Sequence, residues 1–145
     1  MKTNERSELL LGKEALETLQ EKTVLVVGVG GVGSFCVEAL ARTGVGHLIL
    51  IDKDCVELSN INRQLVASLD TVNKIKVDVL KERISKLNPH CIVDTYACFY
   101  DQTKDDEIFS QSIDFVVDCI DSIKSKKDLM QACIDRNIPF LSSMG

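Results

Sequence analysis

Residues 24–34 read VLVVGVGGVGS, a short apolar run that passes directly into a glycine-rich stretch. The run 24–27 is apolar and β-branched, which is typical of a strand buried on both faces of a parallel sheet. From Val32 onward the apolar residues recur with the spacing of one face of a helix, and this pattern stops near Gly44. The stretch therefore predicts a strand, a glycine-rich turn and a helix.

The glycines of this turn have the spacing of a phosphate-binding motif. Gly28, Gly30 and Gly33 fit G-x-G-x-x-G, in which missing side chains allow a sharp turn, close approach to phosphate and tight helix packing. The start of the following helix offers free N–H groups and a partial positive charge to an anion. By itself the motif is weak, but its place between strand and helix predicts a phosphate-bearing nucleotide.

The rest of the chain continues the alternation of strands and helices. Further strands are expected at 48–51, 91–97, 114–120 and 138–143, and further helices at 72–87, 105–112 and 122–136. Repeated β-α-β units with right-handed crossovers give a mostly parallel sheet covered by helices on both faces. We therefore expect an α/β, Rossmann-like, doubly wound sheet in the order 3-2-1-4-5, with its ligand crevice at the carboxyl ends of the strands.

Length and composition fit one ordinary domain. The chain has 145 residues, of which 45% are hydrophobic and 27% charged, with a net charge of −5; this argues against a protein held to nucleic acid mainly by its bulk charge. Six cysteines without a C-x-x-C pair signal neither a zinc site nor a redox dithiol and favour a reducing, cytoplasmic setting. No stretch reaches the roughly 18 apolar residues of a membrane span.

We expect two regions along the chain. Residues 1–22, whose apolar residues include Leu9, Leu10 and Leu16, predict a segment of one or two short helices that packs on the sheet. Residues 23–145 form the Rossmann-like domain that contains the nucleotide crevice.

The segment DKDCVELSNINRQL, residues 52–65, follows the second strand and distinguishes between nucleotides. Asp52 comes about 20 residues after the glycines and is suited to hydrogen-bond a ribose, which fits NAD and ATP equally well. A triphosphate, however, carries about four negative charges, which a dry crevice must neutralise with Mg²⁺, Arg or Lys. The chain supplies Arg63 and Lys76, and it adds polar groups at Asn60, Asn62, Gln64, Asp118 and Asp121. Their convergence at one sheet edge favours ATP.

Several stretches together resemble the adenylating superfamily of ubiquitin-activating and sulfur-carrier-activating enzymes. They are VLVVGVGGVGS, ARTGVGHLILIDKDCVELSNINRQ, Lys76, NPH and DCIDSIKSKKDLMQACIDRNIPFLSSMG. Within the superfamily, ARTGVG, NINRQ and CIDSIKSKK are most similar to the branch of tRNA threonylcarbamoyladenosine dehydratases, which cyclise that modified adenosine beside the anticodon. The similarity runs from about Arg6 to Gly145.

This resemblance implies an enzyme and its partners. The enzyme would use ATP and Mg²⁺ to adenylate the carboxylate of threonylcarbamoyladenosine in tRNA, releasing pyrophosphate, and ring closure would then release AMP. The resemblance also implies a homodimer in the cytoplasm, with a sulfur-transfer protein as a candidate partner. One alternative is an adenylyltransferase that activates the C-terminus of a ubiquitin-like or sulfur-carrier protein. Another is an NAD-binding oxidoreductase or a non-catalytic Rossmann module.

The resemblance further implies which residues hold the nucleotide. The glycines would line the phosphates, Asp52 would hold the ribose, and the polar residues after it would order the pocket. Ser122 stands where sulfur-carrier activators have Asn, which favours the dehydratase branch. The implied binding set is Gly28, Gly30, Gly31, Gly33, Asp52, Asp54, Asn60, Arg63, Gln64, Lys76 and Ser122.

Three of the implied residues would act in catalysis. Arg63 would reach the phosphates of ATP bound in the partner subunit as an arginine finger, Lys76 would contact the phosphates, and Asp121 would hold Mg²⁺. Because members of this superfamily continue beyond the fifth strand, we expect this chain to hold the nucleotide crevice without part of the substrate site. We therefore expect the chain alone to have little catalytic activity.

Overall fold

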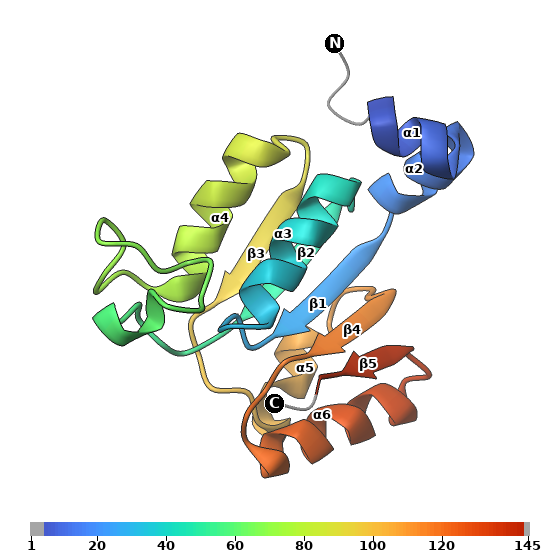
Figure 1. Cartoon of the computed structure of the whole chain (residues 1–145). Coiled ribbons are helices and arrows are strands. Elements are labelled where there is room, and N and C mark those ends of the chain that lie inside the picture. Colours follow the sequence, from blue (N-terminus) through green and yellow to red (C-terminus); the bar gives the residue numbers. More distant parts are fainter. Residues whose placement is uncertain (1–4, 144–145) are drawn as a thin grey trace.

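The computed structural model describes residues 5–143 and contains a five-stranded sheet in the order β3-β2-β1-β4-β5 (Figure 1). Every neighbouring pair of strands is parallel. The strands are β1 (Thr23–Val27), β2 (His47–Ile51), β3 (Ile92–Tyr96), β4 (Phe115–Asp118) and β5 (Phe140–Ser142). The predicted Rossmann-like fold and its strand order are therefore confirmed.

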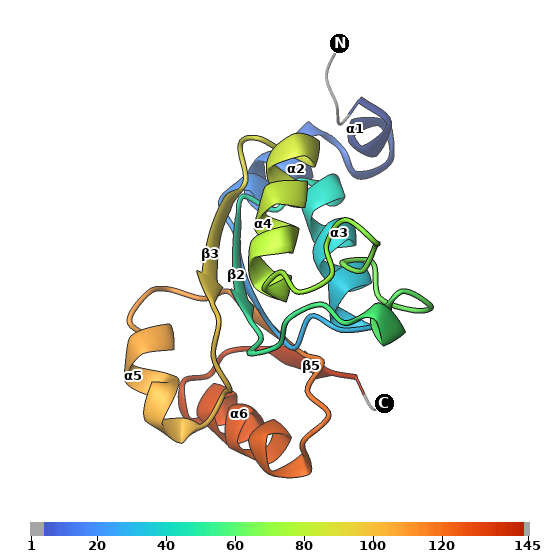
Figure 2. The same ribbon diagram turned by 90° about the vertical axis from the view of Figure 1, so that its left-hand side faces the viewer.

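Helices cover both faces of the sheet (Figure 2). Helices α3 (Gly33–Thr43) and α4 (Lys76–Leu87) lie on one face, while α5 (Asp105–Ile108) and α6 (Ile123–Asp135) lie on the other. Along β1, Val24 and Val26 pack in the core between the sheet and helices α3 and α4. Leu25 and Val27 pack in the core between the sheet and helices α5 and α6. A continuous apolar strand fits here because both of its faces are buried.

Helix α4 begins later than its apolar spacing predicts. Val72 lies in a turn, Asn73 has a left-handed φ of 69°, and Ile75 forms an antiparallel bridge with Cys55. The left-handed residue ends any helical run before it, and the bridge ties this segment to the loop after β2. The prediction that the helix starts at residue 72 was therefore wrong, and Lys76 is the first helical residue.

Other elements after β3 are also shorter than predicted. The expected strand 114–120 ends at Asp118, because the Asp118 carboxylate accepts a hydrogen bond from the Ile120 N–H and turns the chain. The expected helix 105–112 is only four residues long and follows the 3-10 turn η2 (Gln102–Lys104). A second 3-10 turn, η1 (Leu58–Asn60), lies in the loop after β2.

The N-terminal segment contains α1 (Glu5–Leu11) and α2 (Lys13–Gln20). Helix α2 packs on the domain through Leu19, which lies against the core on the α3 side of the sheet, and its Leu16 is buried, with 6% exposed. Helix α1 has no buried residue, and Leu9 and Leu10 are 85% and 84% exposed. The prediction that these two leucines pack on the sheet was wrong: the chain turns at Gly12, which has a φ of 85°, and α1 lies beside α2 away from the strands (Figure 1). Residues 1–4 of the expected segment lie outside the described residues.

Across residues 5–143, none of the helices has the length and apolar character needed to cross a membrane.

Candidate nucleotide-binding site

A crevice of about 660 Å³ lies at the carboxyl ends of the strands, where the strand order reverses around β1. Its walls come from the glycine turn after β1, the loop after β2, the start of α4 and the segments after β3 and β4. All but one of the sequence-predicted binding and catalytic residues line it. They are Gly28, Gly30, Gly31, Asp52, Asp54, Asn60, Arg63, Gln64, Lys76, Asp121 and Ser122.

The four glycines of the turn differ in how much room a side chain would have. Gly28 has a φ of 87°, and a Cβ atom there would lie 2.5 Å from the Cys119 carbonyl oxygen. A Cβ atom on Gly33 would lie 1.8 Å from the Gly28 carbonyl oxygen, so Gly33 packs α3 onto the turn and does not line the crevice. Gly30 and Gly31 have more room, because their nearest neighbours are the side chains of Gln64 and Arg63, respectively, at 3.5 Å and 3.7 Å. These two glycines therefore face the crevice.

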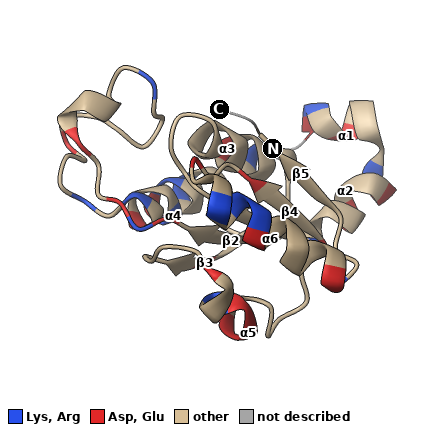
Figure 3. Ribbon diagram, turned by 90° about the horizontal axis from the view of Figure 1, so that it is seen from below, with Lys and Arg blue, Asp and Glu red and all other residues tan. Residues whose placement is uncertain are grey.

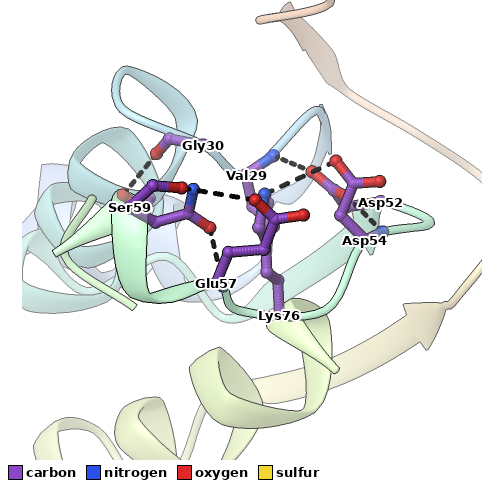
Figure 4. Close-up of polar contacts among 9 residues, drawn as sticks. Val29, Gly30, Asp52, Asp54, Glu57, Ser59 and Lys76 are labelled. Atoms are coloured by element: carbon purple, nitrogen blue, oxygen red, sulfur yellow. Dashed lines mark hydrogen bonds and ion pairs between the residues drawn. The ribbon is translucent and has the colours of Figure 1, made fainter. Parts of the chain in front are cut away.

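Asp52 joins the glycine turn to the loop after β2 (Figure 4). One carboxylate oxygen accepts the Val29 N–H at 2.9 Å, and the other accepts the Asp54 N–H at 2.8 Å. A carboxylate has about four acceptor sites, so each oxygen can still accept a ligand hydroxyl. The residue thus fixes the turn and can bind a ribose at the same time.

Lys76 reaches the crevice from the first residue of α4. Its side chain is 6% exposed, and its Nζ atom lies 3.5 Å from an Asp54 carboxylate oxygen (Figure 4). The backbone N–H of Lys76 also donates to the Asp54 carbonyl oxygen. Because an ammonium has three N–H donors, one long contact to Asp54 leaves donors for an anionic ligand.

Asn60 orders the loop that carries Arg63 and Gln64. Its side chain is buried and accepts the Glu57 N–H at 3.0 Å, forming a capping box around η1. The backbone carbonyl oxygen of Asn60 accepts the backbone N–H groups of both Arg63 and Gln64. Asn60 therefore contributes to the site mainly by holding these two residues in place.

Arg63 lies in the crevice of its own chain. Its guanidinium donates to the Ser59 carbonyl oxygen at 3.1 Å and to the Asn62 side chain at 2.9 Å, and its aliphatic part lies beside Gly31. The resemblance implied that Arg63 reaches a nucleotide in a partner subunit, and that role stays a prediction. The fold of a single chain already brings Arg63 to the glycine turn.

Gln64 carries an unpaired buried atom. Its Nε2 atom lies beside Gly30, while its Oε1 atom is buried and has no hydrogen-bond partner among residues 5–143. A buried acceptor without a partner costs free energy unless a ligand or water donates to it. Together with the open glycines, this atom fits a crevice that binds a polar ligand.

The two aspartates after β4 differ in their surroundings. Asp121 and Ser122 line the crevice, and the Ser122 hydroxyl caps α6 by accepting the Ser125 N–H at 3.5 Å. Asp118 is fully buried and binds the Lys126 ammonium at 2.6 Å. The expectation that Asp118 contributes a carboxylate to the crevice was therefore wrong, because its charge is neutralised inside the domain.

The sequence interpretation missed the wall formed by the segment after β3. Cys98, Phe99 and Tyr100 line the crevice there, and the Lys53 ammonium lies 5.5 Å from the centre of the Phe99 ring. Their position directly after a strand could have indicated that they line the crevice, since the carboxyl ends of all parallel strands lie at the same edge of the sheet.

Comparisons with known proteins agree with this geometry. Residues 4–145 match the sequence model of the ThiF family. The chain is 51% identical over 140 residues to tRNA threonylcarbamoyladenosine dehydratase of Bacillus subtilis, covering 97% of this chain and 55% of that protein. It is 33% identical over 126 residues to molybdopterin-synthase adenylyltransferase of Escherichia coli, covering 87% and 50% of the two chains.

A solved structure shows the same architecture. The crystal structure of E. coli tRNA N6-threonylcarbamoyladenosine dehydratase in complex with ATP matches with a TM-score of 0.94 and 38% identity. The match covers 97% of this chain and 58% of that one. The chain thus spans about half the length of the curated relatives it matches. Because the family model matches nearly all of its residues, the chain belongs to the ThiF family.

Proposed function

We propose that this protein is an ATP-dependent tRNA threonylcarbamoyladenosine dehydratase. The observation that carries the proposal is the crevice, in which a glycine turn, the Asp52 carboxylate and two cations from separate elements face one space. The dehydratase from Bacillus subtilis and the ATP complex of the E. coli enzyme support the choice of substrate and nucleotide.

The nucleotide would lie along the edge of the sheet. Asp52 would accept the ribose hydroxyls, while Gly30 and Gly31 would let the phosphates approach the start of α3. Arg63 and Lys76 would neutralise the triphosphate, with Arg63 acting on ATP bound to its own chain. The Gln64 carboxamide beside Gly30 would add hydrogen bonds from the opposite side.

The reaction converts a poor leaving group into a good one. A carboxylate oxygen of the substrate forms a bond to the α-phosphorus of ATP as the bond to pyrophosphate breaks, which gives an acyl-adenylate. A neighbouring atom of the same threonylcarbamoyl group then attacks the acyl carbon, and AMP leaves with the former carboxylate oxygen. The chain needs no nucleophile of its own, because positioning and charge neutralisation carry both steps.

We propose Asp121 as the protein ligand of a Mg²⁺ ion. Asp121 is exposed on the crevice wall, and among residues 5–143 no three His, Cys, Asp or Glu side chains gather into a metal-binding group. A single carboxylate fits Mg²⁺ in a nucleotide site, because this ion usually takes its other ligands from phosphates and water. The ion would neutralise charge on the leaving pyrophosphate.

Activation of a ubiquitin-like or sulfur-carrier protein is the second candidate function. The same crevice would serve it, and the molybdopterin-synthase adenylyltransferase is a relative. The higher identity to the dehydratase and the presence of Ser122 instead of Asn favour the tRNA substrate. An NAD-binding role has less support, since the compared relatives are named as dehydratase or adenylyltransferase.

The oligomeric state and the cellular compartment of the protein are proposals as well. We propose a homodimer, because the exposed Leu9 and Leu10 of α1 offer apolar surface that a second subunit can cover. The six cysteines are all free thiols, which supports a reducing, cytoplasmic setting. A sulfur-transfer protein stays a candidate partner on the strength of the family relationship alone.

A binding titration tests the nucleotide assignment. Calorimetry of this chain with ATP and Mg²⁺, and separately with NAD, should show tighter binding of ATP, because Arg63 and Lys76 match a triphosphate. Tighter binding of NAD would contradict the assignment and favour a dinucleotide enzyme.

A further inference from the structure

The first half of α6 carries three lysines, which colour the start of the helix blue in Figure 3. Lys124 and Lys127 are exposed, but Lys126 is only 7% exposed. The Lys126 ammonium donates to the Asp118 carboxylate at 2.6 Å, to the Ser142 hydroxyl at 3.1 Å and to the Ser143 carbonyl oxygen at 2.9 Å. All three N–H donors of this buried ammonium are therefore used.

The Asp118 carboxylate is the other half of this buried network. One oxygen accepts the Ile120 N–H at 3.0 Å, and the other also accepts the Ser142 hydroxyl at 2.6 Å. The Asp118 carbonyl oxygen accepts the Ser143 N–H at 2.8 Å. The network thus joins the ends of β4 and β5 to the first turns of α6.

The network lies directly behind one wall of the crevice. Neither Lys126 nor Asp118 lines the crevice, but Ile120, Ser122 and Ser143 do. The bond from Asp118 to Ile120 fixes the turn just before Asp121, and the Lys126 backbone N–H donates to the Ser122 carbonyl oxygen at 2.9 Å. The turn that carries Asp121 is therefore bonded to Asp118 and Lys126, neither of which lines the crevice.

Stability alone gives a weak reason for this ion pair. Two charges taken out of water lose hydration, and well-packed apolar residues of similar volume often stabilise a protein equally well. A buried pair that uses every donor of its ammonium does, however, hold its neighbours in one arrangement.

We propose that Lys126 is a positioning residue: through Asp118 it holds the turn at 119–122 so that Asp121 points at Mg²⁺ on the nucleotide. This proposal rests on the proposed function, because it assumes that MgATP binds in the crevice. The expected effect is on the Mg²⁺ dependence of nucleotide binding more than on binding of ATP without the metal.

The test measures ATP binding to this chain by calorimetry over a range of Mg²⁺ concentrations, together with thermal unfolding. Lys126→Met is compared with Lys126→Arg, which keeps the charge, and with the neutral pair Asp118→Asn/Lys126→Met, which leaves no unpaired buried charge. Lys127→Met is the matched control, since Lys127 is exposed on the same helix. The neutral pair should fold and should need about ten times more Mg²⁺ for half-maximal enhancement of ATP binding. Lys126→Arg should recover most of this loss, and Lys127→Met should match the wild type.

Two results would overturn the proposal. If the neutral pair folds and responds to Mg²⁺ like the wild type, Lys126 does not position the metal ligand. If Lys126→Met and the neutral pair both fail to fold, the network is a requirement of folding and not of positioning. A wild-type chain that binds no ATP removes the proposed function itself, and this is seen before any variant is measured.

Discussion

Gly33 and Gly31 differ in what an added methyl group would meet. A Cβ atom on Gly33 would overlap the Gly28 carbonyl oxygen, whereas one on Gly31 would make ordinary contacts with Arg63. We expect Gly33→Ala to lower the free energy of unfolding by about 1–3 kcal/mol, as overpacking does. We expect Gly31→Ala to change it by less than about 0.5 kcal/mol and to weaken ATP binding, because its methyl group faces the crevice. Urea unfolding and ATP titration of both variants measure this; equal losses of stability would contradict it.

Arg63 is the residue on which the triphosphate assignment depends most. We expect Arg63→Ala in the intact enzyme to lower the rate of adenylation about 100-fold or more, because a donor aimed at developing charge is lost. Pyrophosphate release is the measurement. Arg42→Ala is the control, since Arg42 is exposed and pairs with Glu38 outside the crevice.

Mixed subunits decide whether Arg63 acts on its own chain. If Arg63 served a partner's nucleotide, mixing Arg63→Ala subunits with Lys76→Ala subunits would create one complete site per heterodimer and restore activity. Because Arg63 lies beside Gly31 of the same chain, we expect no restoration. Recovery of pyrophosphate release in the mixture would show that the arginine acts across the dimer.

Single residues also show where prediction from the sequence succeeds. The positions of Gly28, Gly30 and Asp52 could be predicted because they depend only on the order of one strand, one turn and the next strand. The different surroundings of Asp118 and Asp121 could not be predicted, because they depend on β5 and α6. These elements supply Ser142 and Lys126 to the Asp118 carboxylate, whereas Asp121 lies on the crevice wall.

Among the elements, α3 and α4 are tied together by a shared carboxylate. Glu38 on α3 accepts hydrogen bonds from Arg83 on α4 and from Arg42 on its own helix. The Arg83 guanidinium holds the pKa of Glu38 below its ordinary value of 4.5. The pair therefore stabilises the fold at pH values above about 4.5, and this stabilisation is lost as the pH falls through the lowered pKa.

We expect Glu38→Gln to reduce the free energy of unfolding by up to about 1 kcal/mol at neutral pH. The difference from the wild type should disappear as the pH falls through the lowered pKa of Glu38. Chemical unfolding at pH 7 and over this acidic range measures it. Glu17→Gln on α2 should change little, since Glu17 and its partner Lys13 are both exposed; a difference for Glu38→Gln that persists in acid would contradict the assigned cause.

The boundaries of elements were less predictable than their order. Val72 and Ile75 have the spacing of a helical face, but the bridge from Ile75 to Cys55 draws that segment into the loop after β2. Local periodicity cannot detect such a contact, because its partner lies on another element. Because α4 starts at Lys76, this residue lies at the first turn of the helix and reaches the crevice. The wrongly predicted boundary is therefore next to a residue of the site.

For the whole molecule, the strand order was predictable because right-handed crossovers and buried strands leave few alternatives. The position of the crevice followed from that order, since it lies where the strand order reverses around β1. The exposed leucines of α1 were not predictable as exposed, because apolar spacing indicates burial without indicating against which surface. The proposed homodimer gives these leucines a partner surface.

The proposed dehydratase would cyclise threonylcarbamoyladenosine in tRNA. Mass spectrometry of nucleosides from the anticodon loop, in cells that lack the gene, tests it most directly. We expect the cyclic nucleoside to disappear and its uncyclised precursor to accumulate. We also expect the wild-type gene, but not its Arg63→Ala form, to restore the cyclic product. An unchanged level of the cyclic nucleoside in the deletion strain would show that the protein is not the dehydratase.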